Sequence, residues 1–380
     1  RIRIDAEPHA VFIVDRIESA KPIKVCTHFV ITKEFIMRKT NIALLLFIII
    51  SVSCQKGLYS ESKRNNRRNE AVREAAMTMS QFRNTSPLNL DSERLMLWRK
   101  FQEYSDQLKS TTFKEYLKKP EEEAVMMEDT IPTLYFYREG FDKVLHEVKN
   151  SEVQYGNTLV WMLYNMGFVV KTPSGCFGID IDHRLAERLE PYLDFLCITH
   201  NHGDHYNNKL VEAMINHDKP VLSNFHKGSQ EYVSTVATSY KIGNFSIRTD
   251  ISDHLANPDL PDFVTLFRIE GGDDSGNFSI LHCGDSGFNP KHFTNIAGEV
   301  NMVILRWGAP RENNILGSGK GQVKPDYAVL SHLIELRHEP YPHGQASITK
   351  TLEHLPNVNC ENTILPFWGE KMRWENGKLY

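Results

Sequence analysis

The sequence predicts an α/β fold for residues 131–380, preceded by a helical extension over residues 91–130. Short apolar runs bounded by Gly, Pro and Asn residues are typical of strands. Stretches with helical spacing stand between several of these runs, and this interleaving is typical of an α/β domain. At about 250 residues the segment is long enough to bury one well-packed core.

The extension is predicted from its apolar spacing. Its apolar side chains recur every three to four residues, at Leu95, Trp98, Phe101, Tyr104 and Leu108. Asp91 or Ser92 is placed to cap the first helix, and a second short helix is expected to end before Pro120. An aromatic stripe of this kind is typical of a packing face, so we expect the extension to dock on the main domain.

The elements of the main domain follow from apolar runs separated by turn residues. Strands are expected, in chain order, at residues 159–164, 167–171, 176–181, 193–198, 245–249, 263–269, 278–281, 300–305 and 327–330. Helices are expected at residues 184–191 and 207–216.

Charge and cysteine spacing exclude several classes of protein. The formal net charge of −4 gives no basic domain, so no nucleic-acid partner is expected. The cysteines of this part of the chain form no CxxC pair, which excludes a zinc finger or a thioredoxin-like site.

The chain before residue 91 carries the features of an exported protein. It begins at Arg1, and the first methionine, Met37, is followed by two basic residues, the apolar run 42–50 and small residues before Cys54. This is the order of regions in a secretory signal, and the run is shorter than the ~20 apolar residues of a spanning helix. We therefore expect residues 1–36 to be an over-extended gene start and residues 37–53 to be a signal peptide. A short anchor helix is the alternative.

Cys54 resembles the cysteine of a bacterial lipobox, which is diacylated and becomes the mature N-terminus. The resemblance implies that residues 54–90 are a lipidated cysteine and a polar tether. It also implies that the protein lies in the cell envelope, anchored to a membrane and facing the periplasm. Gln55 favours the outer membrane by resemblance to known lipoproteins, and the inner membrane is the alternative.

A cluster of metal-ligand residue types follows the expected strand 193–198. It consists of His200, His202, Asp204 and His205. Imidazole and carboxylate groups are ligands of divalent metals such as zinc. His200 and His202 are two residues apart, so an extended chain points both the same way, and Asp204 and His205 can face a second ion. A solvated polar loop is the alternative. The spacing favours a metal site.

Further ligands are expected where other strands begin or end. His254 precedes the strand at 263–269, Asp285 follows Gly284 after the strand at 278–281, and His332 follows the strand at 327–330. His338 and His343 lie close behind His332, and either is an alternative to it. We prefer His332, because a strand end holds a ligand more rigidly than a Pro-rich loop does. A purely structural histidine is the alternative for His338 and His343, and also for His282.

This order of motifs, HxHxDH, a distant His, Gly-Asp and a final His, resembles the metallo-β-lactamase superfamily over roughly residues 150–370. The resemblance implies a four-layer αββα sandwich with two metal ions, most simply zinc, along one edge of its sheets. The ligands it implies are His200, His202 and His254 for the first ion, Asp204, His205 and His332 for the second, and Asp285 bridging them.

The resemblance also implies a chemistry. His202 stands where the oxygen-handling branch carries Glu, so the site resembles the hydrolytic branch, in which a metal-bound hydroxide attacks the substrate. Asp204 is then a catalytic residue as well as a ligand, because it orients that hydroxide. His338, His343 and Tyr341 are candidate proton donors.

The expected substrate is a small or lipid-like molecule. Trp307 lies in a segment that resembles the loop bordering the active site of lactonase-like and phospholipase-D-like members, so it is a candidate substrate contact. A phosphodiester or a lactone-like ester is therefore expected, and a phospholipid-type substrate suits a lipid anchor. A β-lactam hydrolase and a non-catalytic, metal-stabilised binding lipoprotein are the alternatives.

Overall fold

The computed structural model describes residues 68–226, 228, 230–307, 314–340 and 346–380, which form one compact unit from Arg68 to Tyr380. The expected gene start, the signal peptide and Cys54 lie outside the described residues, and so do Tyr341 and His343. Among the helices in these described ranges, none combines the length and the apolar character that crossing a membrane requires.

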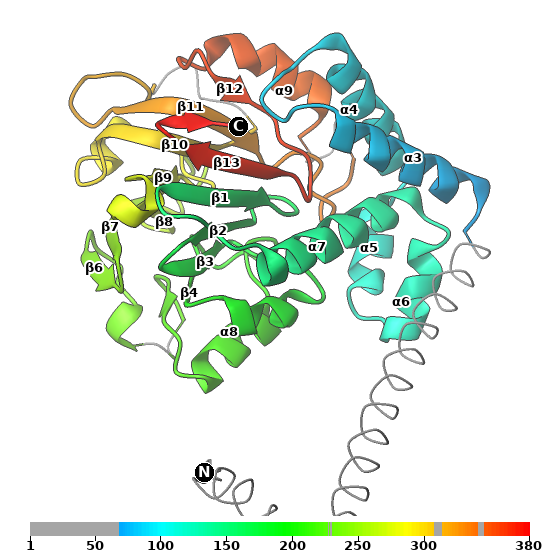
Figure 1. The fold of residues 1–380 in the computed structure, drawn as a ribbon, viewed down its shortest axis with the longest axis horizontal. Helices are drawn as coiled ribbons and strands as arrows, with labels where there is room; N and C mark the ends of the chain where they lie inside the picture. Colours follow the sequence, from blue (N-terminus) through cyan, green and yellow to red (C-terminus); the bar gives the residue numbers. More distant parts are fainter. Residues whose placement is uncertain (1–67, 227, 229, 308–313, 341–345) are drawn as a thin grey trace, which may run out of the picture. The chain divides into compact units, whose positions relative to one another are not determined.

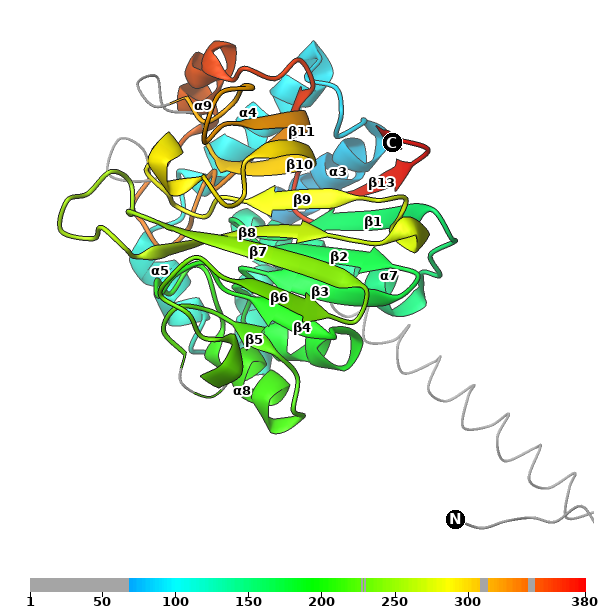
Figure 2. The ribbon, with the colours of Figure 1, turned by 90° about the vertical axis from the view of Figure 1, so that its left-hand side faces the viewer.

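Two mixed seven-stranded sheets form the centre of the unit (Figures 1 and 2). The first sheet has the order β14-β13-β1-β2-β3-β4-β5, and the second has the order β12-β11-β10-β9-β8-β7-β6. The strands of the first sheet are β1 (Asn157–Met162), β2 (Phe168–Thr172), β3 (Gly175–Ile179), β4 (Phe195–Cys197), β5 (Val221–Leu222), β13 (Lys371–Glu375) and β14 (Lys378–Leu379). Those of the second are β6 (Ser239–Ile242), β7 (Phe245–Ser252), β8 (Val264–Glu270), β9 (Ser279–His282), β10 (Gly298–Arg306), β11 (Val323–Ser331) and β12 (Thr363–Ile364).

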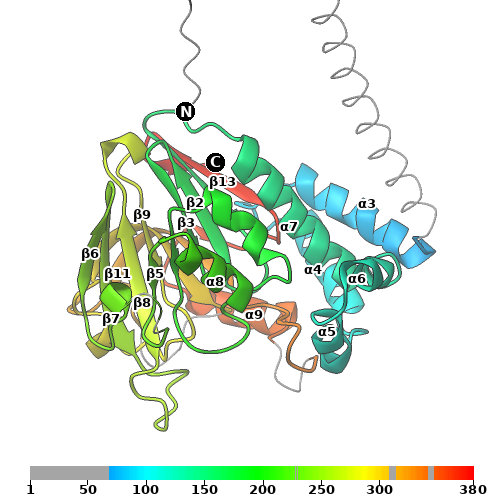
Figure 3. The same cartoon turned by 90° about the horizontal axis from the view of Figure 1, so that it is seen from below.

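Helices lie outside the two sheets. They are α3 (Glu70–Asn84), α4 (Ser92–Ser105), α5 (Ser110–Tyr116), α6 (Glu121–Glu128), α7 (Pro132–Asn150), α8 (Asn208–Asn216) and α9 (Ile348–His354). Figure 3 shows α7 and α8 on one side of β2 and β3, with β7 and β8 on the other side. In Figures 1 and 2, α9 lies beside β11 of the second sheet. The layers therefore follow the αββα order, and the predicted fold class is confirmed.

The alternation of side chains along β1 explains how the layers are held together. Leu159 and Trp161 pack against Phe141, Val144 and other apolar residues of α7 and α8. Val160 and Met162 belong instead to the core that includes residues of the second sheet. Successive side chains of a strand point to opposite faces, so a strand covered on both faces is a continuous apolar run.

The extension is more extensive than the sequence predicts. The expected helices are present, and the side chain of Asp91 caps α4 by accepting a hydrogen bond from the backbone N–H of Arg94 at 2.9 Å. However, α3 lies within residues 54–90, which were expected to be a polar tether. Four of its apolar residues, Val72, Ala75, Met79 and Phe82, recur at helical spacing and are buried. The expectation of a tether is therefore wrong from Glu70 to Asn84.

Three further differences concern the main domain. Residues 184–191, expected as an α-helix, form instead a 3₁₀ helix over Ala186–Tyr192, with Pro191 inside it. The long helix α7 was not predicted, and neither was the hairpin of β13 and β14. β13 pairs with β1, although more than half of the described chain separates the two strands in sequence. A pairing between such distant segments leaves no local sequence pattern.

Candidate metal centre

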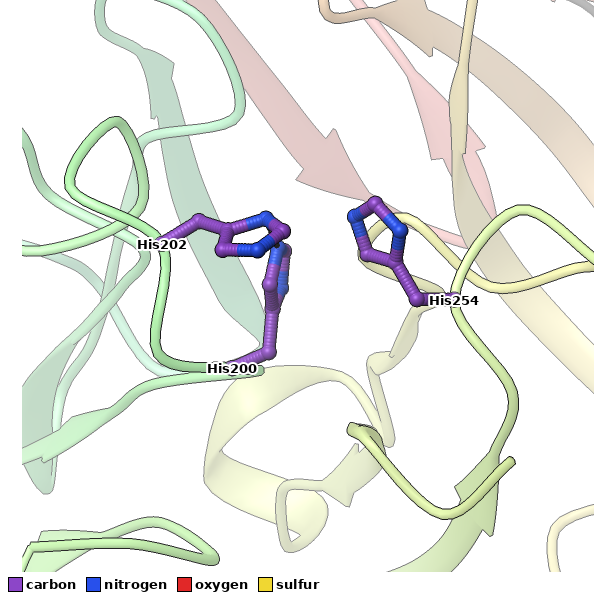
Figure 4. Close-up of side chains that lie close together, drawn as sticks. All are labelled: His200, His202 and His254. Atoms are coloured by element: carbon purple, nitrogen blue, oxygen red, sulfur yellow. Dashed lines mark hydrogen bonds between the residues drawn. The ribbon is translucent and has the colours of Figure 1, made fainter. Parts of the chain in front are cut away.

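The seven predicted ligands come from four loops at the ends of strands. His200, His202, Asp204 and His205 follow β4 of the first sheet. His254 follows β7, Asp285 follows β9 and His332 follows β11, all in the second sheet. β9, β10 and β11 are parallel, so their carboxyl ends lie at the same edge. Figure 4 shows His200 and His202 on one loop, with the ring of His254 facing them from another.

The structure brings these seven residues into three overlapping groups. The groups are His200, His202 and His254; His200, His205 and Asp285; and Asp204, His205 and His332. Within each group, one donor atom from every residue lies within 4.8 Å of the others. The groups share His200 and His205, so the arrangement is one continuous cluster.

The first group presents three imidazole nitrogens to one another. Nε2 of His200 lies 3.1 Å from Nδ1 of His202. The other nitrogen of His200 lies 3.0 Å from the hydroxyl of Thr199, which leaves Nε2 to face the cluster. Burial, together with the neighbouring histidines, lowers the pKa of His200 well below its usual value. The neutral imidazole favoured in this way is the form that binds a metal.

The second and third groups contain the carboxylates of Asp285 and Asp204. Oδ2 of Asp285 lies 3.3 Å from Nε2 of His332, 3.6 Å from Nε2 of His254 and 3.7 Å from Nε2 of His205. Asp285 therefore lies close to histidines of all three groups. Oδ2 of Asp204 lies 3.3 Å from Nε2 of His332 and 3.4 Å from Nε2 of His205.

Protonated histidines balance these carboxylates in the metal-free protein. Burial alone would raise the pKa of Asp204, but His205 and His332 outweigh it and hold that pKa well below its usual range. Conversely, burial lowers the pKa of His332, but Asp285 and Asp204 outweigh it and raise that pKa to about 10. Positive charge is thus favoured between the two aspartates, where the second ion is expected.

Unpaired polar atoms show that the cluster fits a metal. Nε2 of His205, His254 and His332 and Oδ1 of Asp285 are buried and have no hydrogen-bond partner among the described residues. A buried polar atom without a partner costs about 1–3 kcal/mol, and a bound cation would satisfy all four. Five imidazoles and two carboxylates are also a donor set that suits zinc.

Asp180 and Asn165 support the cluster, and the sequence analysis missed both. Asp180, which directly follows β3, accepts hydrogen bonds from the backbone N–H and the hydroxyl of Thr199 at 2.8 and 2.6 Å, and its Oδ2 lies 2.8 Å from Nδ1 of His205. The side-chain amide of Asn165 donates to the backbone carbonyl and Oδ2 of Asp204, while the backbone carbonyl of Asn165 accepts from the backbone N–H of His332. Asn165 lies between two expected strands, which was an available signal, whereas Asp180 was expected inside the strand 176–181 and follows a strand only in the structure.

The backbone conformation and close packing at residue 284 explain why the Gly-Asp motif has a glycine there. Its φ of +48° is a conformation that side-chain-bearing residues rarely adopt, and a Cβ there would lie 2.8 Å from both Cβ and Oγ1 of Thr199. Only glycine lets the turn that carries Asp285 approach Thr199, the residue that orients His200.

The structure separates the remaining candidates. His282 is a structural residue, because its Nε2 pairs with the carbonyl of Met166 at 3.0 Å and its Nδ1 accepts from the N–H of Gly284 at 3.2 Å. Of the described candidates for the last ligand, His332 joins the cluster, whereas His338 pairs with Glu335 and lies outside all three groups.

Trp307, which directly follows β10, packs against residues of α9. Its ring packs 5.0 Å from the ring of His354, and Nζ of Lys350 lies 4.3 Å from its centre, so its neighbours there belong to α9. The guanidinium of Arg306 lies 5.4 Å from the same ring. None of these contacts is with the seven clustered residues.

No protein-family profile and no curated protein sequence matches the chain. Among solved structures, the metallo-beta-lactamase fold protein YhfI from Bacillus subtilis is 14% identical with a TM-score of 0.40, over 57% of this chain and 99% of that one. Igni18, a metallo hydrolase from Ignicoccus hospitalis, is 16% identical with a TM-score of 0.41, over 58% and 99%. CmlA, a diiron beta-hydroxylase from Streptomyces venezuelae, is 12% identical with a TM-score of 0.39, over 60% and 55%. These likenesses are remote, so the chemistry of the site is argued from its own residues.

Proposed function

We propose that this protein is a metal-dependent hydrolase whose seven clustered residues hold two divalent ions, most simply zinc. The observation that carries the proposal is the position of Asp285, whose Oδ2 lies 3.3–3.7 Å from Nε2 of His254 in the first group and of His205 and His332 in the third. Two such ions, when bound, supply a hydroxide at neutral pH and polarise the bond under attack.

Asp204 has the geometry of a residue that orients the attacking group. Its carboxylate is buried, held ionised by His205 and His332, and fixed by the hydrogen bond from Asn165 at 3.2 Å. Because an ionised carboxylate only accepts hydrogen bonds, it aligns a water molecule by accepting a hydrogen bond from it.

His338 is the described residue placed to donate a proton to the leaving group. Its Nδ1 pairs with the buried carboxylate of Glu335, and its side chain is 58% exposed. The hydrogen bond with Glu335 raises the pKa of His338, so the protonated form is favoured near neutral pH. Its other nitrogen is free to act, since the Glu335 contact uses only Nδ1. A proton donor of this kind is needed when an ester with a poor leaving group is cleaved.

The substrate we propose is a phosphodiester or a lactone-like ester, small or lipid-like. Purified protein would be analysed for bound metal and tested on bis-p-nitrophenyl phosphate, a lactone and a β-lactam. We expect two metals per chain and turnover of an ester, with both lost in His202→Ala and Asp285→Asn. His146→Gln is the matched control, because His146 is exposed on α7 and lies outside the cluster.

Two results would decide against this function. Protein that binds two metals but turns over nothing in a broad ester panel would favour a non-catalytic binding protein, and turnover of the β-lactam alone would favour a β-lactamase. Protein with full activity in both cluster variants would show that the site lies elsewhere.

We also propose that the protein acts in the cell envelope, on a lipid anchor at Cys54. The support is the order of basic, apolar and small residues from Met37 to Cys54. Incorporation of labelled palmitate, lost in Cys54→Ala, and processing that globomycin blocks are the expected results. If the wild-type protein takes up no labelled palmitate, the proposal of a lipid anchor at Cys54 is contradicted.

A further inference from the structure

We propose that Arg306 binds an anionic group of the substrate beside the metal ligands, so that the site takes a phosphate-type ester in preference to a neutral lactone or β-lactam. This inference rests on the proposed hydrolase function and specifies its substrate class. It assigns a role in substrate recognition to a residue that the cluster itself does not use.

The backbone places Arg306 between two loops of the cluster. It is the last residue of β10, which lies between β9 and β11 and runs parallel to both. β9 leads to Asp285 and β11 leads to His332. Arg306 pairs with Ser331, the residue directly before His332. The central strand of the three therefore ends in a guanidinium at the edge where its neighbours carry metal ligands.

The register of the strands shows which face Arg306 occupies. Ile304, two residues earlier, pairs with His282, and paired residues of neighbouring strands share a face. The ring of His282 lies 5.9 Å from that of Phe168 on β2, so this face looks into the space between the two sheets. Arg306 belongs to the same face, one step beyond His282 toward the edge that carries the cluster.

The contacts of the side chain agree with this placement. Nε of Arg306 donates to the carbonyl of Ser286 at 3.3 Å, and Ser286 both follows Asp285 and pairs with His254. The guanidinium carbon lies 5.0 Å from the centre of the Phe288 ring. The side chain of Arg306 is thus held against Ser286, which follows Asp285 in the chain and pairs with His254.

The charge of Arg306 is not matched by a carboxylate of the residues that the structure describes. Its two terminal nitrogens donate no hydrogen bond to any residue that the structure describes, and it forms no ion pair there. By contrast, each of the largely buried arginines elsewhere has an acidic partner: Arg94, Arg138, Arg184, Arg268 and Arg337. Burial lowers the pKa of Arg306, while the nearby carboxylates of Asp285 and Asp253 act in the opposite direction.

An anionic substrate group would supply the missing partner. A guanidinium offers a planar fork of donors that matches phosphate oxygens, and Nε is already engaged, so the terminal nitrogens remain for the ligand. Neutral lactones and β-lactams carry no such anion at their carbonyl. A phosphodiester carries one next to the bond that is cut, so metals and Arg306 would bind the same group.

The test compares anionic and neutral substrates in Arg306→Met, which keeps an apolar stem against Phe288 but removes the charge. We expect KM for bis-p-nitrophenyl phosphate to rise about 10- to 100-fold, as for the loss of a charge-assisted hydrogen bond. KM for a neutral p-nitrophenyl ester and the metal content should stay unchanged. Arg99→Met, on the exposed face of α4, is the matched control.

A second readout does not depend on turnover. Calorimetric titration of the zinc-loaded protein with inorganic phosphate should show weaker binding in Arg306→Met, and an intermediate affinity in Arg306→Lys, which also serves if the Met variant does not fold. Unchanged phosphate affinity, or an equal loss on anionic and neutral esters, would overturn the proposal. Wild-type protein that turns over no ester would overturn the hydrolase function, while the phosphate titration would still decide the role of Arg306.

Discussion

Oδ2 of Asp180 lies 2.8 Å from Nδ1 of His205, and both side chains are fully buried. Burial lowers the pKa of His205, but the carboxylates of Asp204 and Asp180 outweigh it and raise that pKa well above its usual value. The contact engages Nδ1 and leaves Nε2 facing the cluster. A carboxylate behind a ligating histidine fixes the orientation of its ring and increases its basicity.

Asp180→Asn should weaken zinc binding without abolishing it. Loss of such a supporting carboxylate typically costs about 10- to 100-fold in metal affinity. Competition with a chromophoric chelator would measure the affinity. Asp326→Asn is the control, since Asp326 is exposed on β11 outside the three groups. Equal zinc affinities in wild type and Asp180→Asn would contradict the assigned role.

His338→Gln should separate substrates by their leaving groups. For an alkyl phosphodiester, whose alkoxide leaves poorly, we expect kcat to fall by about 10²- to 10⁴-fold, because the proton donor is lost. For bis-p-nitrophenyl phosphate, whose phenolate leaves without a proton, the change should be small. Steady-state kinetics on both substrates would measure the effect, and an equal loss on both would argue for a structural role of His338.

Breaking the ion pair between Arg94 and Glu370 should destabilise the fold strongly. The pair joins α4 to the turn before β13, the side chain of Arg94 is fully buried, and its NH2 also donates to the carbonyl of Leu365 at 2.8 Å. Removing one partner of a buried pair leaves an unpaired charge, so Arg94→Met should lower the free energy of unfolding by about 3–5 kcal/mol.

Urea unfolding would measure this loss of stability, with a surface ion pair as the control. Arg83 and Glu139 lie 2.8 Å apart but are partly exposed, so Arg83→Met should cost at most about 1 kcal/mol. Comparable losses in the two variants would show that the Arg94 pair does not anchor the extension.

His183 should make the fold sensitive to acid. Its ring stacks on Phe141, with 3.9 Å between the ring centres and an interplanar angle of 3°. Burial and the nearby arginines Arg138 and Arg184 lower its pKa well below the usual value. The folded state therefore keeps His183 neutral, whereas the unfolded chain takes up a proton below about pH 6.5. The stability that depends on this group is present above that pH and is lost as the pH falls below it.

His183→Phe would reveal this effect. As the pH falls from 7 to 5, wild type should lose stability that the variant keeps. The free energy of unfolding of the variant should therefore rise relative to that of wild type, by up to about 1.4 kcal/mol per pH unit. Urea unfolding of metal-free protein at several pH values would measure it. His146→Phe, at an exposed position, should give a constant difference. A constant difference for His183→Phe would contradict the prediction.

Local patterns predicted the elements whose signals lie within a few residues. The apolar spacing of α4, the cap at Asp91 and the strands β7 to β11 of the second sheet could be read in this way, whereas β6 and β12 were not predicted. Helix α7, the hairpin of β13 and β14 and the helix α3 were missed. The hairpin depends on pairing with β1. The first half of α7 is buried on every side from Thr133 to Arg138, so the apolar stripe that continues through Phe141, Val144 and Val148 is obscured at its start.

The sequence by itself determined the donor set of the HxHxDH loop, because residues two to five positions apart after one strand necessarily lie close together. It also placed His254, Asp285 and His332 at strand termini. Only the tertiary structure decided that these termini converge, and that His332, with its φ of +57° and its backbone held by Asn165, turns into the cluster while His338 pairs with Glu335.

The tertiary structure also decided which residues stand beside the ligands. Asp180 and Arg306 are an acidic and a basic residue at the ends of two strands in different sheets, and neither belongs to a metal-ligand motif. Their roles depend on what lies across from them in space: His205 for Asp180, and the turn at Ser286 for Arg306. The order of residues along a chain specifies which donors are available. The packing of the sheets specifies which of them face the same point.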